Sequence, residues 1–267
     1  MWACPVCSQA LEKTERTWRC GEGHSYDCAK EGYVNLLLAN QKRSADPGDT
    51  REMMLNRRAF LEAGYYQDLA SALSQVLQDL KIENLLDCGC GEGYYLQQFL
   101  QSEPAVSIWG LDISRDAVRM GSKSLKTSAN FAVASSFQLP VLSSSVDLVL
   151  RVFAPGSIDE LKRVLKPQGA FVLIVPGPRH LFSLKQALYD TPTLHDLPEV
   201  PEGFECESER HISFELKLPD NEAVNQLLAM TPFVWKGSRE AKESLENAAQ
   251  FTSEADFYIR VYRQNEL

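Results

Sequence analysis

The segment from Glu83 to Leu100 changes from a short apolar run to a glycine-rich stretch and then to a helical pattern, ENLLDCGCGEGYYLQQFL. The apolar run ends in Asp87, and glycines follow at positions 89, 91 and 93. A glycine loop between a buried strand and a helix is typical of sites where the backbone must approach a ligand closely. The segment therefore predicts a strand, a ligand-binding loop and a helix, which form the first unit of an α/β fold.

Four further apolar segments follow the loop and alternate with helical patterns. They lie at 107–114, 130–140, 146–155 and, after a helix, in the second half of 160–178. The first of them ends near Asp112, which comes 19 residues after Gly93. In an open α/β sheet the ligand lies beyond the carboxyl ends of the strands. The residues expected to converge there are Gly89, Gly91, Gly93, Asp112 and Ser136.

The spacing of the glycines indicates which cofactor this loop serves. A dinucleotide-binding loop would need a glycine where Tyr94 stands. The acid before the first glycine and the G-x-G-x-G spacing instead resemble motif I of the class I S-adenosylmethionine (SAM)-dependent methyltransferases. That resemblance implies a Rossmann-like, mostly parallel seven-stranded sheet, in which Asp87 counters the positive charge of SAM and Asp112 binds its ribose. The usual acid near the adenine is replaced by Ser135 and Ser136.

A second cysteine-rich stretch lies at the N-terminus, where Cys4, Cys7, Cys20 and His24 have the spacing of a four-ligand zinc site. Four protein ligands with no open position describe a structural zinc, which folds a segment too small to have its own core. Cys28 is an alternative fourth ligand in place of His24. Because Cys88 and Cys90 lack a partner pair nearby, we interpret them as small residues that fill the cofactor loop.

Charge and cysteine content limit the cellular setting and the partners. No apolar run approaches the ~20 residues of a membrane span, and no signal pattern is present, so we expect a cytoplasmic protein. Seven cysteines in a reducing compartment indicate metal or catalytic chemistry before disulfides. The net charge is −9, but residues 1–60 hold nine Lys/Arg against eight Asp/Glu. A polyanion partner should therefore meet the N-terminal part.

These patterns divide the chain into three parts. We predict a zinc-ribbon-like module at 1–36, a linker at 37–60 and a methyltransferase domain at 61–267. The linker contains the turn Pro47-Gly48 and an exposed basic set, Lys42, Arg43, Arg51, Arg57 and Arg58, although residues from 51 onward have helical periodicity. Residues 181–210 read as a long loop or lid, and alternating patterns at 211–218 and 257–263 predict two antiparallel strands.

The chain as a whole resembles the 23S ribosomal RNA guanine-N1 methyltransferases of the Gram-negative type. The segments that carry the resemblance are the zinc module, AKEGYVNLL, KRSADPGDT, EMM, RRAFLEAGYY, DCGCGEGYY, FAP, PGPRHL and MTPFVW. The resemblance implies a guanosine in a hairpin loop of 23S rRNA as substrate, with the zinc module and linker holding RNA, and a possible homodimer. It also implies that Cys4, Cys7, Cys20 and His24 bind zinc. The cofactor contacts that it implies are Tyr66, Gly93, Tyr94 and His180.

Guanine N1 carries a proton near neutral pH, so an enzyme must align N1 with the methyl group, accept that proton and stabilise charge on O6. Arg151 is a candidate O6 stabiliser, with a surface ion pair as the alternative. His180 is a candidate base or orienter, with a cofactor-side hydrogen bond as the alternative. Phe153 could stack on the base or belong to the core.

Two other functions remain open from the sequence alone. One is a small-molecule SAM methyltransferase with a structural zinc appendage. The other is a non-catalytic zinc-ribbon RNA-binding protein built on a degenerate Rossmann-like domain.

Overall fold

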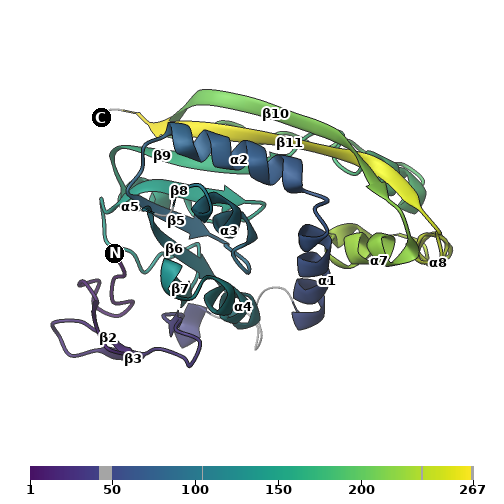
Figure 1. Ribbon diagram of the computed structural model, residues 1–267. Helices are drawn as coiled ribbons and strands as arrows, with labels where there is room; N and C mark the ends of the chain where they lie inside the picture. The colour runs from purple at the N-terminus through teal and green to yellow at the C-terminus, as the bar shows by residue number, and fades with distance from the viewer. Residues whose placement is uncertain (42–49, 104, 236, 266–267) are drawn as a thin grey trace.

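The computed structural model describes residues 1–41, 50–103, 105–235 and 237–265. Its centre is an eight-stranded sheet with the strand order β10-β11-β9-β8-β5-β6-β7-β4 (Figure 1). The predicted Rossmann-like class I fold is confirmed, with one strand more than expected. Lys42, Arg43 and the turn at Pro47-Gly48, all part of the predicted linker, lie outside the described residues.

Five parallel strands form the middle of the sheet, and helices connect β5 to β6, β6 to β7 and β8 to β9. The strands are β5 (Asn84–Cys88), β6 (Ser107–Asp112), β7 (Ala129–Val133), β8 (Val146–Val152) and β9 (Leu165–Pro176). The helices are α3 (Tyr94–Leu100), α4 (Arg115–Leu125), η2 (Lys126–Ser128) and α5 (Ile158–Val164). Because all five strands run the same way, their carboxyl ends meet at one edge, as the sequence predicts.

Two hydrophobic clusters lie on opposite faces of this sheet. Successive residues of a strand point to opposite faces, and in β5 Leu85 belongs to one cluster while Leu86 belongs to the other. The first cluster contains residues of α2 (Gln67–Asp79), α3 and α4. The second contains residues of α5 and of the N-terminal module. The two faces are therefore covered by different parts of the chain.

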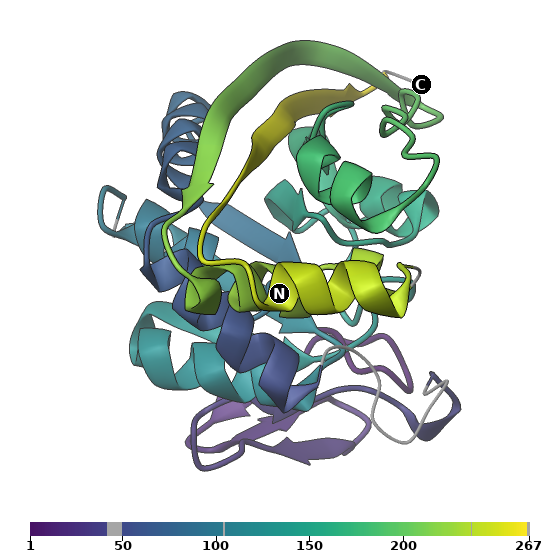
Figure 2. The same cartoon turned by 90° about the vertical axis from the view of Figure 1, so that its right-hand side faces the viewer.

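The C-terminal strands β10 (Phe204–Leu218) and β11 (Phe251–Gln264) form a long antiparallel pair that bows over the rest of the molecule (Figure 2). They are the predicted sixth and seventh strands, and β11 pairs antiparallel with β9. Three helices accompany them: α6 (Phe182–Leu188), α7 (Asn221–Ala229) and α8 (Arg239–Glu246), with a short η3 (Pro232–Trp235). No described helix has the length and apolarity to cross a membrane.

The predicted lid at 181–210 is shorter in the structure. Residues 182–188 form α6, because Leu184 and Leu188 give this segment a buried apolar side. Residues 204–210 belong to β10, where backbone pairing with β11 orders a sequence whose side chains are mostly exposed. Only residues 189–203 lack regular structure.

Helix α1 (Arg51–Glu62) begins inside the predicted linker, where the periodicity predicts a helix, and Gly64 separates it from α2. Thr50 caps α1 by accepting a hydrogen bond from the N–H of Met53 at 3.2 Å. Gly64 has φ +86°, a conformation that favours glycine and that ends the first helical segment. Residues 51–60 of the predicted linker are therefore helical.

The N-terminal module is a small antiparallel sheet of β1 (Glu12–Thr14), β2 (Thr17–Arg19) and β3 (Ser25–Asp27). It continues into β4 (Val34–Asn35), which pairs parallel with β7 and supplies the eighth strand of the main sheet, and then into η1 (Ala39–Gln41). Trp2 is fully buried and packs edge-on against Trp109 of β6. The module therefore shares a hydrophobic core with the main domain.

Candidate active site and zinc centre

The glycine loop after β5 is folded tightly against the neighbouring strand ends. Gly89, Gly91 and Gly93 all have positive φ values, of 86°, 55° and 81°. A Cβ atom on Gly89 would lie only 2.4 Å from the Cβ of Ala154, which follows β8. The loop needs glycine for its backbone conformation and, at position 89, for close packing.

Asp87 lies at the carboxyl end of β5 with 2% of its surface exposed. Among the described residues, none makes a hydrogen bond to its Oδ1 atom. Burial, with a smaller contribution from the negative charge of Asp112, raises the pKa of Asp87 to about 8. A buried carboxyl group with an unused oxygen fits a cationic ligand, because a positive charge nearby would favour its ionised form.

Asp112 at the end of β6 is held in place by two backbone N–H groups. One carboxylate oxygen accepts from Gly91 N at 3.0 Å, and the other accepts from Ser114 N at 2.8 Å. A carboxylate oxygen has more than one acceptor site, which suits hydrogen bonds from the two hydroxyl groups of a ribose. The same bonds connect the ends of β5 and β6, which supports the predicted ribose contact.

Ser136 follows β7 and connects two loops of the same edge. Its Oγ donates a hydrogen bond to the carbonyl oxygen of Pro155 at 2.7 Å, and its own carbonyl accepts from Ser157 N at 3.2 Å. The hydroxyl oxygen retains acceptor capacity, so it can receive a hydrogen bond from an amino group such as that of adenine. The residues present thus fit SAM along the edge formed by β5, β6 and β7.

Aromatic residues border this edge on the β11 side. Tyr66 is buried, and its ring packs edge-on against Phe257, with the ring centroids 5.0 Å apart. The ring of His180 lies 4.5 Å from Phe257 and 6.2 Å from Tyr66, also between centroids. The structure therefore brings together Tyr66 and His180, two of the residues that the family resemblance implies as cofactor contacts.

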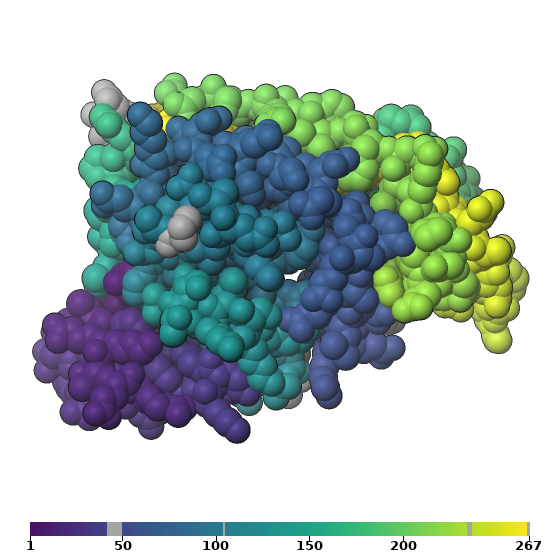
Figure 3. Space-filling view, in the orientation of Figure 1, coloured from purple at the N-terminus to yellow at the C-terminus, as the bar shows by residue number. Residues whose placement is uncertain are grey.

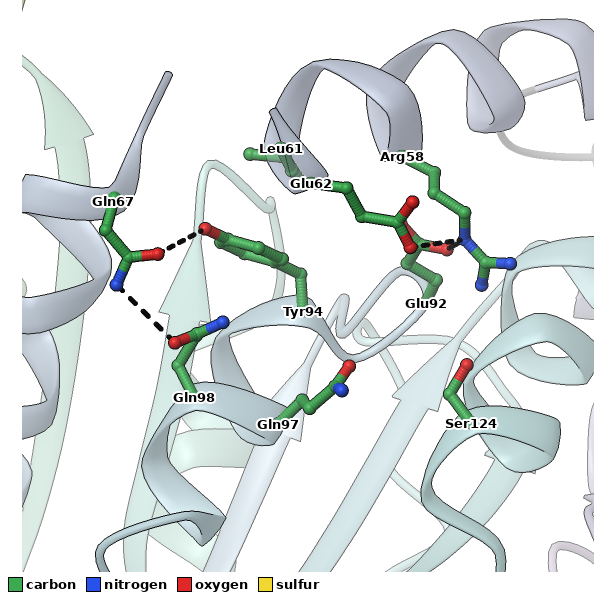
Figure 4. A pocket seen from close by; sticks show the side chains of 9 residues that line it. All are labelled: Arg58, Leu61, Glu62, Gln67, Glu92, Tyr94, Gln97, Gln98 and Ser124. Atoms are coloured by element: carbon green, nitrogen blue, oxygen red, sulfur yellow. Dashed lines mark hydrogen bonds and ion pairs between the residues drawn. The ribbon is translucent and has the colours of Figure 1, made fainter. Parts of the chain in front are cut away.

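Tyr94 is placed differently. It lines a cavity of about 190 Å³ that opens between α1, α3 and α4 (Figure 4). Its hydroxyl donates to Gln67 at 3.5 Å, while Arg58 of α1 pairs with Glu92 of the glycine loop. The surface is hollowed between α1 and the main domain (Figure 3). Neither Asp87 nor Asp112 lines this cavity, so it adjoins the cofactor edge without including its acids.

The N-terminal cluster has the geometry of a metal site. One possible ligand atom from each of Cys4, Cys7, Cys20 and His24 lies within 4.8 Å of the other three. Gly23, with φ +86°, makes the second turn, in which its N–H donates to the carbonyl of Cys20 at 3.0 Å. Three thiols and an imidazole suit tetrahedral Zn²⁺ with no open position. Cys28 lies outside this group of four, so His24 is the fourth ligand that the geometry favours.

Comparison with known proteins also finds a zinc module followed by a methyltransferase domain. Residues 2–45 match the family described as RlmA, N-terminal, a zinc ribbon, and residues 85–169 match a methyltransferase domain family. A 23S rRNA (guanine(748)-N(1))-methyltransferase of Streptomyces fradiae is 31% identical over 87% of this chain and 85% of its own length. This chain belongs to the 23S rRNA (guanine-N1)-methyltransferase family.

Other relatives agree with this assignment. A provisionally named 23S rRNA (guanine-N(1)-)-methyltransferase of Micromonospora griseorubida is 34% identical over 69% of this chain and 68% of its own. A solved methyltransferase of Haloferax volcanii, in complex with the activator Trm112, has a TM-score of 0.53. It covers 82% of this chain and 100% of its own at 18% identity, which supports the fold alone. SAM is thus the cofactor of this methyltransferase, and zinc is its structural metal.

Arg151 of this methyltransferase is buried beneath the loop that follows β8. It shares the face of β8 with Val149, lies 5.5 Å from the ring centroid of Phe171 and is 3% exposed. Its guanidinium donates to the carbonyl of Ser157 at 3.0 Å, beneath the loop after β8. This burial excludes the surface ion pair considered as its alternative, whereas the O6 contact stays a prediction. The guanidinium supports the loop at 153–157.

His180 is buried next to the cofactor edge and is neutral. Burial, with smaller effects from His195 and Lys185, lowers the pKa of His180 to about 3. Its Nδ1 accepts a hydrogen bond from the backbone N–H of Asp256 at 3.4 Å, which places the proton of the neutral ring on Nε2. A group with so low a pKa is a poor base near neutral pH, so the orienting role fits the structure better.

Sequence reasoning missed the residues that hold the His180 loop. The carboxylate of Asp256 accepts from Arg179 N at 2.8 Å and pairs with His211 at 2.6 Å. Its backbone carbonyl accepts from Gly177 N at 2.7 Å. His195, 6.1 Å from His180 between ring centroids, also joins this region. The available signal was two acids, Glu254 and Asp256, in the alternating β11 pattern, which become informative only once β10 and the loop are placed beside them.

Proposed function

We propose that this protein transfers the methyl group of SAM to N1 of a specific guanosine in a hairpin loop of 23S rRNA. The observation that carries the proposal is the alignment with the Streptomyces fradiae 23S rRNA methyltransferase over 87% of the chain, across both the zinc ribbon and the cofactor domain. A generic methyltransferase likeness would be limited to the cofactor domain.

The cofactor edge supports the first half of this reaction. SAM supplies a methyl group made electrophilic by its sulfonium centre. Asp87 would pair with the positive charge of the amino-acid part, and the glycine loop would allow its close approach. Asp112 would hold the ribose, and Ser136 would accept from the adenine amino group. These contacts would hold SAM in one orientation, and orientation of this kind lowers the barrier to methyl transfer.

The residues around His180 support the second half. As N1 releases its proton to solvent water, negative charge grows on O6 of the guanine, and a hydrogen-bond donor there would stabilise it. The Nε2–H group of neutral His180 can donate such a bond, because Nδ1 is occupied by the N–H of Asp256. A low pKa suits this role, since the imidazole stays neutral throughout the working pH range.

The zinc module supports an RNA partner. A groove of about 260 Å³ on this module is lined by Lys13, Arg16 and Lys30, among others. Such cations can contact phosphates, whereas the rest of the chain is strongly acidic. A loop nucleotide is also easier to expose than a paired one. As the family resemblance implies, two copies of the chain could form one longer RNA groove. An rRNA substrate also implies that the enzyme works in the cytoplasm.

The alternative of a small-molecule methyltransferase can be tested without removing the module, whose tryptophans belong to the shared core. A triple variant with Lys13, Arg16 and Lys30 replaced by alanine leaves that core intact. Lost activity on rRNA, with SAM affinity unchanged, would support the RNA enzyme. The third possibility, a non-catalytic binding protein, predicts no SAM binding in calorimetry.

The decisive experiment is to incubate the protein with SAM and unmodified 23S rRNA and to map methylated nucleosides by mass spectrometry. The expected product is a single 1-methylguanosine in a hairpin loop. Methyl on another atom, or no rRNA product at all, would overturn the proposal.

A further inference from the structure

Phe153 is a large apolar side chain left in contact with solvent at the carboxyl end of β8. Its relative exposure is 44%, whereas Leu150 in the same strand is fully buried. The sequence alternative of a core aromatic is therefore wrong. Its backbone also has φ +53°, an unfavourable conformation for a bulky residue. Strained backbone at the end of a strand is common where a side chain must be presented to a ligand.

Phe153 lies close both to the aromatic residues around His180 and to the cofactor loop. It is 5.5 Å from Phe257 between ring centroids, and Phe257 in turn contacts His180 and Tyr66. The next residue, Ala154, packs directly against Gly89 of the cofactor loop. An exposed aromatic face thus adjoins both the predicted methyl donor and the histidine that we expect to act on the acceptor.

The loop that carries Phe153 is held by Ser136 and Arg151. The Oγ of Ser136 donates a hydrogen bond to the carbonyl oxygen of Pro155, and the carbonyl oxygen of Ser136 accepts one from Ser157 N, as described above. A Cβ atom on Gly156 would lie 2.3 Å from the guanidinium of Arg151 and 2.9 Å from the carbonyl oxygen of Ser136. The loop therefore has little room to move, and the ring is preorganised rather than a mobile surface residue.

We propose that the face of Phe153 is the platform on which the acceptor guanine stacks, with its N1 edge turned toward the methyl donor. This inference rests on the proposed function and adds to it the residue that positions the base. A splayed-out loop base loses its stacking neighbours, and an aromatic ring replaces them. The ring would fix the plane of the guanine, while Nε2–H of His180 faces its edge.

Other exposed apolar side chains do not carry the same argument. Val6, Leu55, Leu194 and Val200 are exposed to a similar degree, but scattered aliphatic side chains are ordinary features of a protein surface. Phe137 is aromatic and 54% exposed, but neither it nor any of these four residues has a positive φ. Phe153 differs from them in combining a flat ring, a strained backbone and contact with the residues around the site.

Substitutions of Phe153 distinguish the effect of stacking on a flat ring from the effect of side-chain size. Phe153→Leu keeps an apolar side chain of similar size but loses the flat ring, whereas Phe153→Trp keeps a ring. Base–aromatic stacking corresponds to about 5- to 150-fold in affinity. We expect Phe153→Leu to lower kcat/KM for the rRNA hairpin within that range, with the Kd for SAM unchanged, and Phe153→Trp to remain within about threefold of the wild type.

A hairpin carrying 2-aminopurine at the target position reports stacking directly. Stacking on Phe153 should quench the fluorescence of the bound base, and Phe153→Leu should relieve the quenching. Equal fluorescence and equal kcat/KM in wild type and Phe153→Leu would overturn the inference while leaving the rRNA reaction intact. A wild-type enzyme that gives no 1-methylguanosine would instead overturn the proposed function, so the two failures are distinct.

Discussion

Trp2 packs edge-on against Trp109, with 5.1 Å between their ring centroids, and thereby joins the zinc module to the second strand of the cofactor sheet. Backbone bonds accompany this contact, from Ala3 N to Pro140 O at 2.9 Å and from Leu142 N to Met1 O at 3.0 Å. With β4 paired to β7, the module covers one edge of the main sheet. Loss of zinc should therefore affect the stability of the whole enzyme.

The zinc prediction can be tested with two cysteine variants. Cys20→Ser should lose the single equivalent of zinc and lower the melting temperature of the main unfolding transition, because Trp2 and β4 would lose their support. Cys28→Ser is the matched control and should keep its zinc. Metal analysis and calorimetry measure both effects. Loss of zinc from the Cys28 variant would contradict the assignment of His24 as the fourth ligand.

We expect the carboxylate of Asp87 to lower the stability of the SAM-free protein while strengthening the binding of SAM. Its pKa is about 8 when folded but ordinary when unfolded, so the folded state holds its proton more tightly. The stability it contributes is fully present below about pH 4 and is lost as pH rises toward 8. Asp87→Asn should raise the free energy of unfolding of the SAM-free protein at pH 8.5 by ~1 kcal/mol or more, while weakening SAM binding at least tenfold.

Asp147 provides the control for this effect. Although burial opposes it, hydrogen bonds from Lys166 and Asn84 lower the pKa of Asp147, so its carboxylate stabilises the fold above the ordinary pKa. Asp147→Asn should therefore destabilise the protein at the same pH. Denaturant unfolding of both variants shows whether each substitution raises or lowers the free energy of unfolding. Destabilisation by Asp87→Asn at pH 8.5 would count against a strained carboxylate at this position.

The affinity for SAM should rise with pH for the same reason. If the ionised form of Asp87 binds the positive charge of SAM, affinity should increase by up to tenfold per pH unit between pH 5.5 and 7.5. Binding should also release a proton, which appears in calorimetry as a dependence of the enthalpy on the buffer. Asp87→Asn should flatten the profile. A pH-independent affinity in the wild type would exclude this role for Asp87.

His180 should orient groups without exchanging a proton. Because the pKa of His180 is about 3, the pH profile of kcat/KM between pH 5 and 9 should show no limb from this residue. His180→Ala should weaken SAM binding or lower kcat by the ~10²- to 10³-fold expected for a lost donor. His180→Gln, which keeps a donor, should recover part of that loss. A pH limb near neutrality that disappears in His180→Gln would revive the base hypothesis.

The sequence predicted the parallel strands and the cofactor loop well, because these depend on local periodicity and on glycines whose conformation is local. The sequence could not place β4, because a strand of two residues is too short to show an alternating pattern and its partner β7 lies far along the chain. The roles of Arg151 and His180 also lay beyond it. Which face Arg151 occupies and how deeply His180 is buried follow from packing against Phe171 and Phe257, contacts that no local pattern encodes.

Arg151 and Ser136 both hold the loop of Phe153, so their substitutions should act through the same structure. Arg151→Met removes the bond to Ser157 O but keeps the side-chain volume, and Ser136→Ala removes the bond to Pro155 O. We expect each to lower kcat/KM for rRNA by about tenfold, the scale of one lost hydrogen bond. Arg151→Met should not lower the melting temperature greatly, because within the described residues its buried charge has no carboxylate partner.

The double variant tests whether these two residues act together. Two substitutions that loosen one loop should combine less than additively, because the first already removes what the second would disturb. If Arg151 instead contacted the charge on O6, its substitution alone would lower kcat by ~10²- to 10³-fold. The effect of Ser136→Ala would then add to it in full. Steady-state kinetics at saturating SAM on the four proteins of this cycle decide between support of the loop and direct stabilisation of the reacting base.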